Sequence, residues 1–106
     1  MKFTLRLLPA ADADIDDIAA YIAHDSMDAA LRFLDAIDDT LRLIREHPKR
    51  QALYGFRNER LHDVRRRAVI GFPKFLIFYR VSGRVVEVIR VLHGARDLTR
   101  ALGGER

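Results

Sequence analysis

The stretch FLIFYRVSGRVVEVIRVLH, residues 75–93, decides how this chain folds. It contains two runs rich in Val, Ile, Phe and Tyr, the residue types that fit a pleated, half-buried strand. Ser82-Gly83-Arg84 separates the runs, and a glycine supplies the positive φ that a tight turn needs. Because this connection is too short for a crossover, the sequence predicts an antiparallel hairpin.

Two registers of this hairpin are open from the sequence. A two-residue loop, Ser82-Gly83, would pair Tyr79 with Val86, whereas a three-residue loop that includes Arg84 would pair Tyr79 with Glu87. Both faces are largely apolar in either register, which indicates a place at the centre of a sheet. The arginines within this apolar sheet are the first sign of a binding function.

The N-terminal half predicts one strand and two helices. Phe3 to Leu8 alternates weakly and indicates a strand that Pro9 ends. Apolar residues at spacings of three and four predict an amphipathic helix from Ala10 to about Ala23. After a cap at Ser26, the same spacing predicts a second helix to about Glu46, and the short break between the two makes them an antiparallel hairpin. Four aspartates between residues 12 and 17 fit the start of a helix better than a metal site.

The C-terminal half predicts a basic loop, three strands and a short helix. Residues 47–60 show no clean period and indicate the loop, in which Tyr54 and Arg57 form a candidate binding tip. Residues 61–70 contain a predicted strand, Val64–Ile70, with Arg65 and Arg67 on one face and Arg66 on the other, and residues 71–74 turn the chain into the hairpin. A short helix from about residue 98 to residue 102 is ended by two glycines.

These elements predict one α+β domain over residues 1–106. Its sheet is expected to be antiparallel, formed by the N-terminal strand and a three-stranded C-terminal meander. The helical hairpin must bury its apolar side, and the sheet is the available cover.

Composition and charge narrow the classes of function. The chain has no cysteine, which excludes disulfides and thiolate chemistry, and its four histidines show no ligand spacing, so no metal or other cofactor is predicted. The sequence contains no run of about 18 apolar residues, so no membrane span is predicted and we expect a cytoplasmic protein. Residues 10–46 hold ten Asp or Glu against three Arg, whereas residues 47–106 hold fourteen Lys or Arg against five acids. This split predicts a basic face that attracts nucleic acid or an acidic peptide.

Several segments together resemble the ParE/RelE toxin superfamily. They are Pro9-Ala-Ala with the acidic helix that follows it, Ala29-Ala30 with Phe33, Phe75-Leu-Ile-Phe-Tyr-Arg80 and Arg90-Val-Leu-His-Gly-Ala-Arg-Asp97. The resemblance covers nearly the whole chain and is closer to the ParE branch than to the RelE branch.

The resemblance implies the toxin of a chromosomal or plasmid toxin–antitoxin pair. Such a toxin forms a hetero-oligomer with its antitoxin, whose C-terminal segment wraps it. ParE-type members inhibit DNA gyrase, whereas RelE-type members enter the ribosome and cut messenger RNA. The two branches share a fold, so the fold does not choose between these targets.

The candidate site residues differ between the two targets. An RNA nuclease needs an acid, a base and cations around the phosphate, and His93, Arg96, Arg80 and Arg65 would have to supply them. A tyrosine near the C-terminus, frequent in RelE-type enzymes, is missing from residues 98–106. The sequence therefore favours the gyrase-directed reading. The residues predicted to bind antitoxin or target are Arg65, Arg67, Arg80, Arg90, Tyr54 and Arg57.

Overall fold

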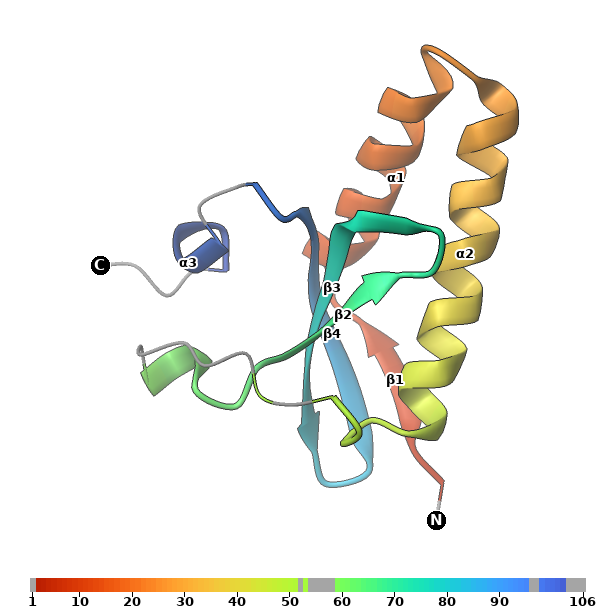
Figure 1. Cartoon of the computed structure of the whole chain (residues 1–106). Helices are drawn as coiled ribbons and strands as arrows, with labels where there is room; N and C mark the ends of the chain where they lie inside the picture. Colours follow the sequence, from red (N-terminus) through yellow and green to blue (C-terminus); the bar gives the residue numbers. More distant parts are fainter. Residues whose placement is uncertain (1, 52, 54–58, 96–97, 103–106) are drawn as a thin grey trace.

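The computed structural model describes residues 2–51, 53, 59–95 and 98–102. The elements in chain order are β1 (Thr4–Leu7), α1 (Pro9–Ala23), α2 (Met27–Glu46), the 3₁₀ helix η1 (Glu59–Leu61), β2 (Arg65–Val69), β3 (Phe72–Ser82), β4 (Val85–His93) and α3 (Leu98–Ala101). The four strands form one sheet in the order β1-β4-β3-β2. Helices α1 and α2 cover one face of the sheet, and η1 and α3 lie against the other (Figure 1).

The β3–β4 hairpin lies at the centre of the sheet, as predicted, but both predicted registers are wrong. Ser82 pairs with Val85, so the loop is Gly83-Arg84 and Tyr79 pairs with Val88. The reason is the turn itself: Gly83 has a φ of 60° and stands first in the loop, the position where a type II′ turn places a glycine. A bulge between Phe78 and Tyr79 then shifts the register again.

The sheet is mixed, which corrects the antiparallel sheet predicted from the sequence. β1 pairs with β4 in parallel, with Thr4 opposite Val85 and Leu7 opposite Val88. Tight turns oblige only β2, β3 and β4 to alternate in direction; β1 reaches β4 through a long connection, which permits a parallel pair. β1 and the first turns of α1 follow β4 in the same direction, so β1 borders the first half of β4 and α1 borders its second half.

Several predicted boundaries also need correction. β1 spans Thr4–Leu7 rather than residues 3–8, β2 spans Arg65–Val69 rather than residues 64–70, and α3 ends at Ala101 rather than at residue 102. The turn predicted at residues 71–74 is shorter, because Val69 already pairs with Phe72 and Gly71 takes the positive φ of 78°. The register shift that follows lies next to Pro73, a residue that cannot donate to a strand ladder.

The helical hairpin forms as predicted. Pro9 opens α1 at a position where its missing N–H is not needed, and the Ser26 side chain accepts a hydrogen bond from the Ala29 N–H (3.0 Å) at the start of α2. Phe33 of α2 is fully buried and packs edge-on against Phe72 and Phe75. The larger core therefore lies between α1, α2 and the sheet. Its buried members are Ala11, Ile15, Phe33, Ile37, Leu41, Ile44, Val69, Ile77, Tyr79, Val86, Val88 and Val91.

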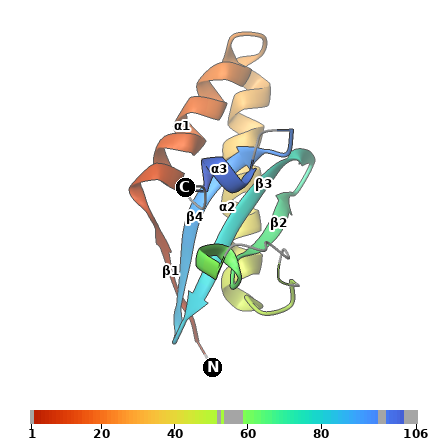
Figure 2. The same cartoon turned by 90° about the vertical axis from the view of Figure 1, so that its left-hand side faces the viewer.

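A second, smaller core lies on the opposite face of the sheet. Figure 2 shows η1 and α3 in front of this face. The residues that pack there are Leu61, Val64, Leu76, Phe78, Leu92 and Leu102. No helix among the described residues is long and apolar enough to cross a membrane.

Candidate functional site

The three consecutive arginines of β2 alternate between the two faces of the sheet, as predicted. Arg65 pairs with Tyr79 and Arg67 pairs with Ile77, and both partners belong to the core under the helices. Arg66 pairs with Phe78, which belongs to the core on the opposite face. Arg65 and Arg67 therefore lie on the same face of the sheet as α2.

Arg65 and Tyr79 hold the start of the basic loop. The Arg65 guanidinium donates to the backbone carbonyl of Gln51, and the Tyr79 hydroxyl donates to that of Pro48 (2.7 Å). Burial raises the pKa of Tyr79 to about 12, although the positive charges of Arg65 and Arg67 act in the opposite direction. The tyrosine is thus a neutral hydrogen-bond donor under physiological conditions.

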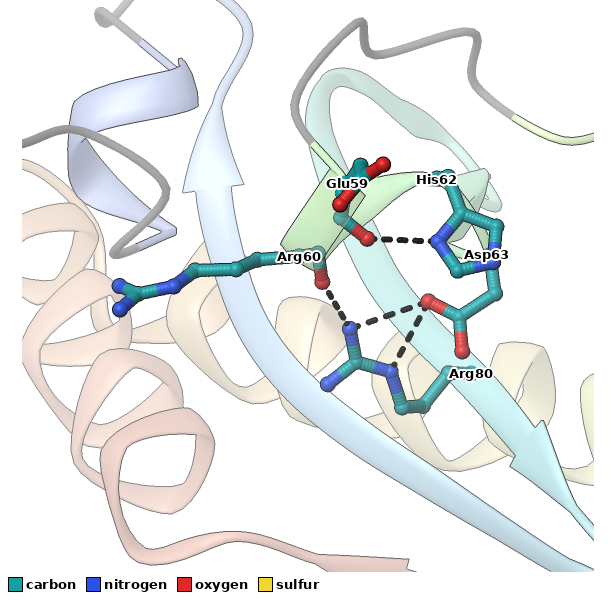
Figure 3. A network of polar contacts seen from close by, with 5 residues as sticks. All are labelled: Glu59, Arg60, His62, Asp63 and Arg80. Carbon is teal, nitrogen blue, oxygen red and sulfur yellow. Dashed lines mark hydrogen bonds and ion pairs between the residues drawn. The ribbon is translucent and has the colours of Figure 1, made fainter.

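Arg80 holds the end of the same loop on the other face of the sheet. Its Nε and Nη2 donate to Asp63 Oδ1 (3.2 and 3.1 Å), and Nη2 also donates to the carbonyl of Arg60 (2.6 Å) (Figure 3). In the same turn, the His62 ring contacts the carbonyl of Glu59 (2.6 Å). Burial alone would raise the pKa of Asp63, but the hydrogen bonds and charge of Arg80 outweigh it and lower this pKa. Arg80 therefore fastens η1 to the sheet.

We expect Asp63→Asn to remove part of the acid sensitivity of folding. Because folding lowers the Asp63 pKa below its ordinary value of 3.8, the ion pair stabilises the fold above that pH and ceases to do so as the pH falls through the folded-state value. The Arg80 and Asp63 side chains are 30% and 44% exposed, so the loss at pH 7 should stay below about 1 kcal/mol. Urea unfolding at pH 7 and pH 3 measures this effect, with Asp28→Asn in an exposed pair as control. An equal acid loss in wild type and Asp63→Asn would assign the titration to another group.

The Arg90 guanidinium makes hydrogen bonds to other parts of the same chain. Its Nε and Nη2 donate to the two carboxylate oxygens of Asp14 (2.7 and 2.9 Å), and its Nη1 donates to the carbonyl of Ala101 (2.7 Å). Asp14 Oδ2 also accepts from the backbone N–H of Val91 (2.9 Å). The hydrogen bonds to Asp14 raise the pKa of Arg90 despite its partial burial. One guanidinium thus joins α1, β4 and α3.

His93 ends β4 beside a shallow groove. Its Nδ1 accepts from the Ala95 N–H (3.0 Å), and its ring stacks edge-on against Phe75 with centroids 5.4 Å apart. The groove has a volume of about 380 Å³ and a partly basic lining. The lining residues are Arg66, Pro73, Lys74, Leu76, His93, Gly94 and Ala95.

The structure does not bring the described candidate nuclease residues together. Arg65 lies on the helix side of the sheet, whereas Arg80, next to Tyr79 along β3, points to the opposite side. His93 pairs with Phe75, five residues from Arg80 along β3, which corresponds to about 16 Å. The predicted residues Tyr54, Arg57 and Arg96 lie outside the described residues.

Two carboxylates that organise the site were not predicted. The sequence pattern marks Asp14 as a charge at a helix start, but its spacing from Ala11 and Ile18 also places it on the inward stripe of α1 and so signals a buried partner. Asp63 carries no comparable signal, because its partner Arg80 lies 17 positions away in a different element.

Comparison with known proteins bears on the family of this chain. Residues 5–98 match the family model described as ParE toxin of type II toxin-antitoxin system, parDE. A solved structure described as the chromosomal ParDE TA system from P. aeruginosa has a TM-score of 0.69 and 20% sequence identity, which shows a shared fold. The match covers 87% of this chain and 96% of that chain. No curated protein matches significantly. Since the family model spans most of the sequence, the chain belongs to the ParE toxin family of type II toxin–antitoxin systems.

Proposed function

We propose that this ParE-type toxin inhibits DNA gyrase by binding it, and that a cognate antitoxin neutralises the toxin in the cytoplasm. The observation that carries the choice of mechanism is the separation of the candidate acid–base and phosphate-binding residues. Arg65 and Arg80 lie on opposite faces of the sheet, and His93 lies about 16 Å from Arg80 along β3.

Metal-independent RNA cleavage needs its proton-transfer groups within hydrogen-bond reach of one phosphate. Among the described candidates, Arg80 is engaged by Asp63 and the Arg60 carbonyl, and His93 Nδ1 is engaged by the Ala95 N–H. His93 shares its groove with the cations Arg66 and Lys74, whereas Arg65 and Arg80 are not among the residues that line this groove. Inhibition of gyrase by binding does not require proton-transfer and phosphate-binding groups to meet at one phosphate, and therefore fits the geometry better.

A proteinaceous antitoxin fits the exposed surface. Tyr21 and Met27 at the loop end of the helical hairpin are 76% and 64% exposed, although both are large and apolar. The loop end of the hairpin extends beyond the sheet (Figure 1), so neither residue can be covered by it. Together with the basic half of the chain, such a surface suits an amphipathic, acidic partner segment.

We expect the purified toxin to stop gyrase from supercoiling relaxed plasmid DNA, with cleaved DNA accumulating in the reaction. Adding the antitoxin encoded beside the toxin gene should restore supercoiling, because the bound toxin can no longer reach gyrase. Relaxation by topoisomerase I, which should not change, controls for simple DNA coating by a basic protein. Unimpaired supercoiling, with ribosome-dependent cuts in translated messages instead, would favour the endoribonuclease alternative.

A further inference from the structure

The Nε of Arg67 is a buried hydrogen-bond donor without a partner in the described part of the chain. Leaving a buried donor unpaired is destabilising, and more so for a charged group. The unpaired Nε therefore indicates that the described residues do not fully compensate Arg67.

Arg67 lines a small pocket at the C-terminal end of α2. The pocket, here called the Arg67 pocket, has a volume of about 50 Å³. One water needs roughly 10–15 Å³ of such volume, so the pocket can hold a few waters or one carboxylate group. Its lining residues are Leu43, Ile44, His47, Arg50, Gln51 and Arg67.

The positive charge around this pocket lacks a counter-charge among the residues that the structure describes. In the described residues, none of Arg50, Arg65 and Arg67 has a carboxylate within ion-pair distance. The sequence from residue 47 to residue 58 contains no Asp or Glu at all. Glu46, which precedes His47 in the chain, lines a different groove together with Lys2 and Phe3. Asp63 pairs with Arg80 instead.

The partial negative charge at the C-terminus of α2 compensates the positive charge of Arg50, Arg65 and Arg67 only in part. A helix end contributes less stabilisation to a nearby cation than a buried, unpaired charged donor costs. The missing interaction is a counter-charge for Arg67, which lines the pocket, and a carboxylate would supply it together with charge-assisted hydrogen bonds.

The surroundings of the pocket favour a peptide over a nucleic acid as the source of the anion. Leu43 at the pocket and Ile70 after β2 are 38% and 41% exposed. The Ile70 N–H donates to Thr40 Oγ1 (3.0 Å), one helical turn before Leu43, which keeps this end of β2 against α2. β2 is also an edge strand, and among the described residues an isolated bridge joins Leu53 to Arg65 on its outer side. Apolar side chains beside an edge strand suit an extended peptide.

We propose that the Arg67 pocket binds the side-chain carboxylate of an acidic peptide segment, whose apolar neighbours lie against Leu43 and Ile70. In the cell this segment belongs to the antitoxin, so the identity of the partner rests on the proposed function. The chemistry of the pocket does not rest on it.

The first experiment tests the pocket alone, by NMR of arginine Nε–H signals. The probe is the blocked peptide Leu-Glu-Val-Glu-Leu, and its control is the same peptide with Gln in place of Glu. We expect the Arg67 signal, assigned by its loss in Arg67→Lys, to shift saturably with the Glu peptide and to stay in place with the Gln peptide. No shift with the Glu peptide overturns the proposal, and so does a shift produced only by inorganic phosphate or duplex DNA.

The second experiment tests the contact within the complex, by calorimetric titration of the toxin with its antitoxin. Arg67→Gln should weaken binding by about 10- to 100-fold, because it removes one partner of a desolvated charge pair. The matched control is Arg84→Gln in the exposed β3–β4 turn, which should bind as wild type does. Unchanged melting temperatures ensure that both variants are folded.

The outcomes separate the two proposals. Equal antitoxin affinity of wild type and Arg67→Gln overturns the pocket as an antitoxin contact while the proposed function stands. Failure of wild type to bind the antitoxin overturns the proposed function, and in that case the shift of the Arg67 signal by the Glu peptide still decides the pocket.

Discussion

Asp14→Asn is expected to lower the free energy of unfolding by about 1–3 kcal/mol, because it weakens charge-assisted hydrogen bonds in a partly buried ion pair. The Arg90 and Asp14 side chains are only 23% and 13% exposed. Replacing the carboxylate leaves the guanidinium with little water and no counter-charge. The substitution also weakens the acceptor for the Val91 N–H. β1 cannot replace this acceptor, because the strand ends at Leu7 and does not reach Val91. Urea unfolding followed by circular dichroism measures the change.

A control in the same helix separates this pair from the general effect of acidic residues in α1. Asp16 is exposed, and Asp16→Asn should change the stability by no more than about 0.5 kcal/mol. The double variant Asp14→Asn with Arg90→Met should lose less than the sum of the two single changes, since the two residues interact directly. A loss below 1 kcal/mol in Asp14→Asn, or strict additivity of the two changes, would contradict this account of how α1 is attached to β4.

The parts of the fold predicted correctly from sequence are those set by local periodicity and local caps. The apolar spacing from Ala30 to Ile44 defines the buried side of α2, and Ser26 marks its start. The double-sided apolar character of residues 75–92 places β3 and β4 at the centre of the sheet. In each case the signal and the structure it causes lie within the same stretch of chain.

The parts predicted wrongly depend on contacts between distant stretches or on the detail of a turn. The direction of β1 follows from its pairing with β4, some eighty residues later, which no local pattern encodes. The hairpin register depends on whether Gly83 stands first or second in the loop, and the sequence permits either. The ion pair of Arg80 with Asp63 arises because η1 folds back over the sheet. Arg80, which was predicted to bind antitoxin or target, therefore makes a structural contact within the chain.

Expression of the double variant His93→Ala with Arg96→Ala is expected to arrest growth as wild type does, with DNA breaks and intact messenger RNA. Inhibition of gyrase by binding does not use a proton-transfer group, so removing the one histidine that could serve as one should leave toxicity in place. A ribosomal nuclease would behave in the opposite way, because loss of its acid–base group and of a phosphate-binding cation lowers the rate by several orders of magnitude. The measurement pairs viable counts with sequencing of RNA ends and a reporter of the DNA-damage response.

Two controls make this result decisive. Co-expression of the antitoxin should abolish the breaks and the growth arrest together, which ties both to the toxin. The melting temperature of the purified variant must match that of wild type, because His93 packs against Phe75 and its removal could loosen the end of β4. With folding intact, loss of toxicity in the double variant together with codon-phased RNA cuts by wild type would transfer the function to the ribosome. The arginines could not make that distinction, since they suit gyrase-bound DNA, ribosomal RNA and an acidic antitoxin equally well; proton transfer is the one requirement that the two mechanisms do not share.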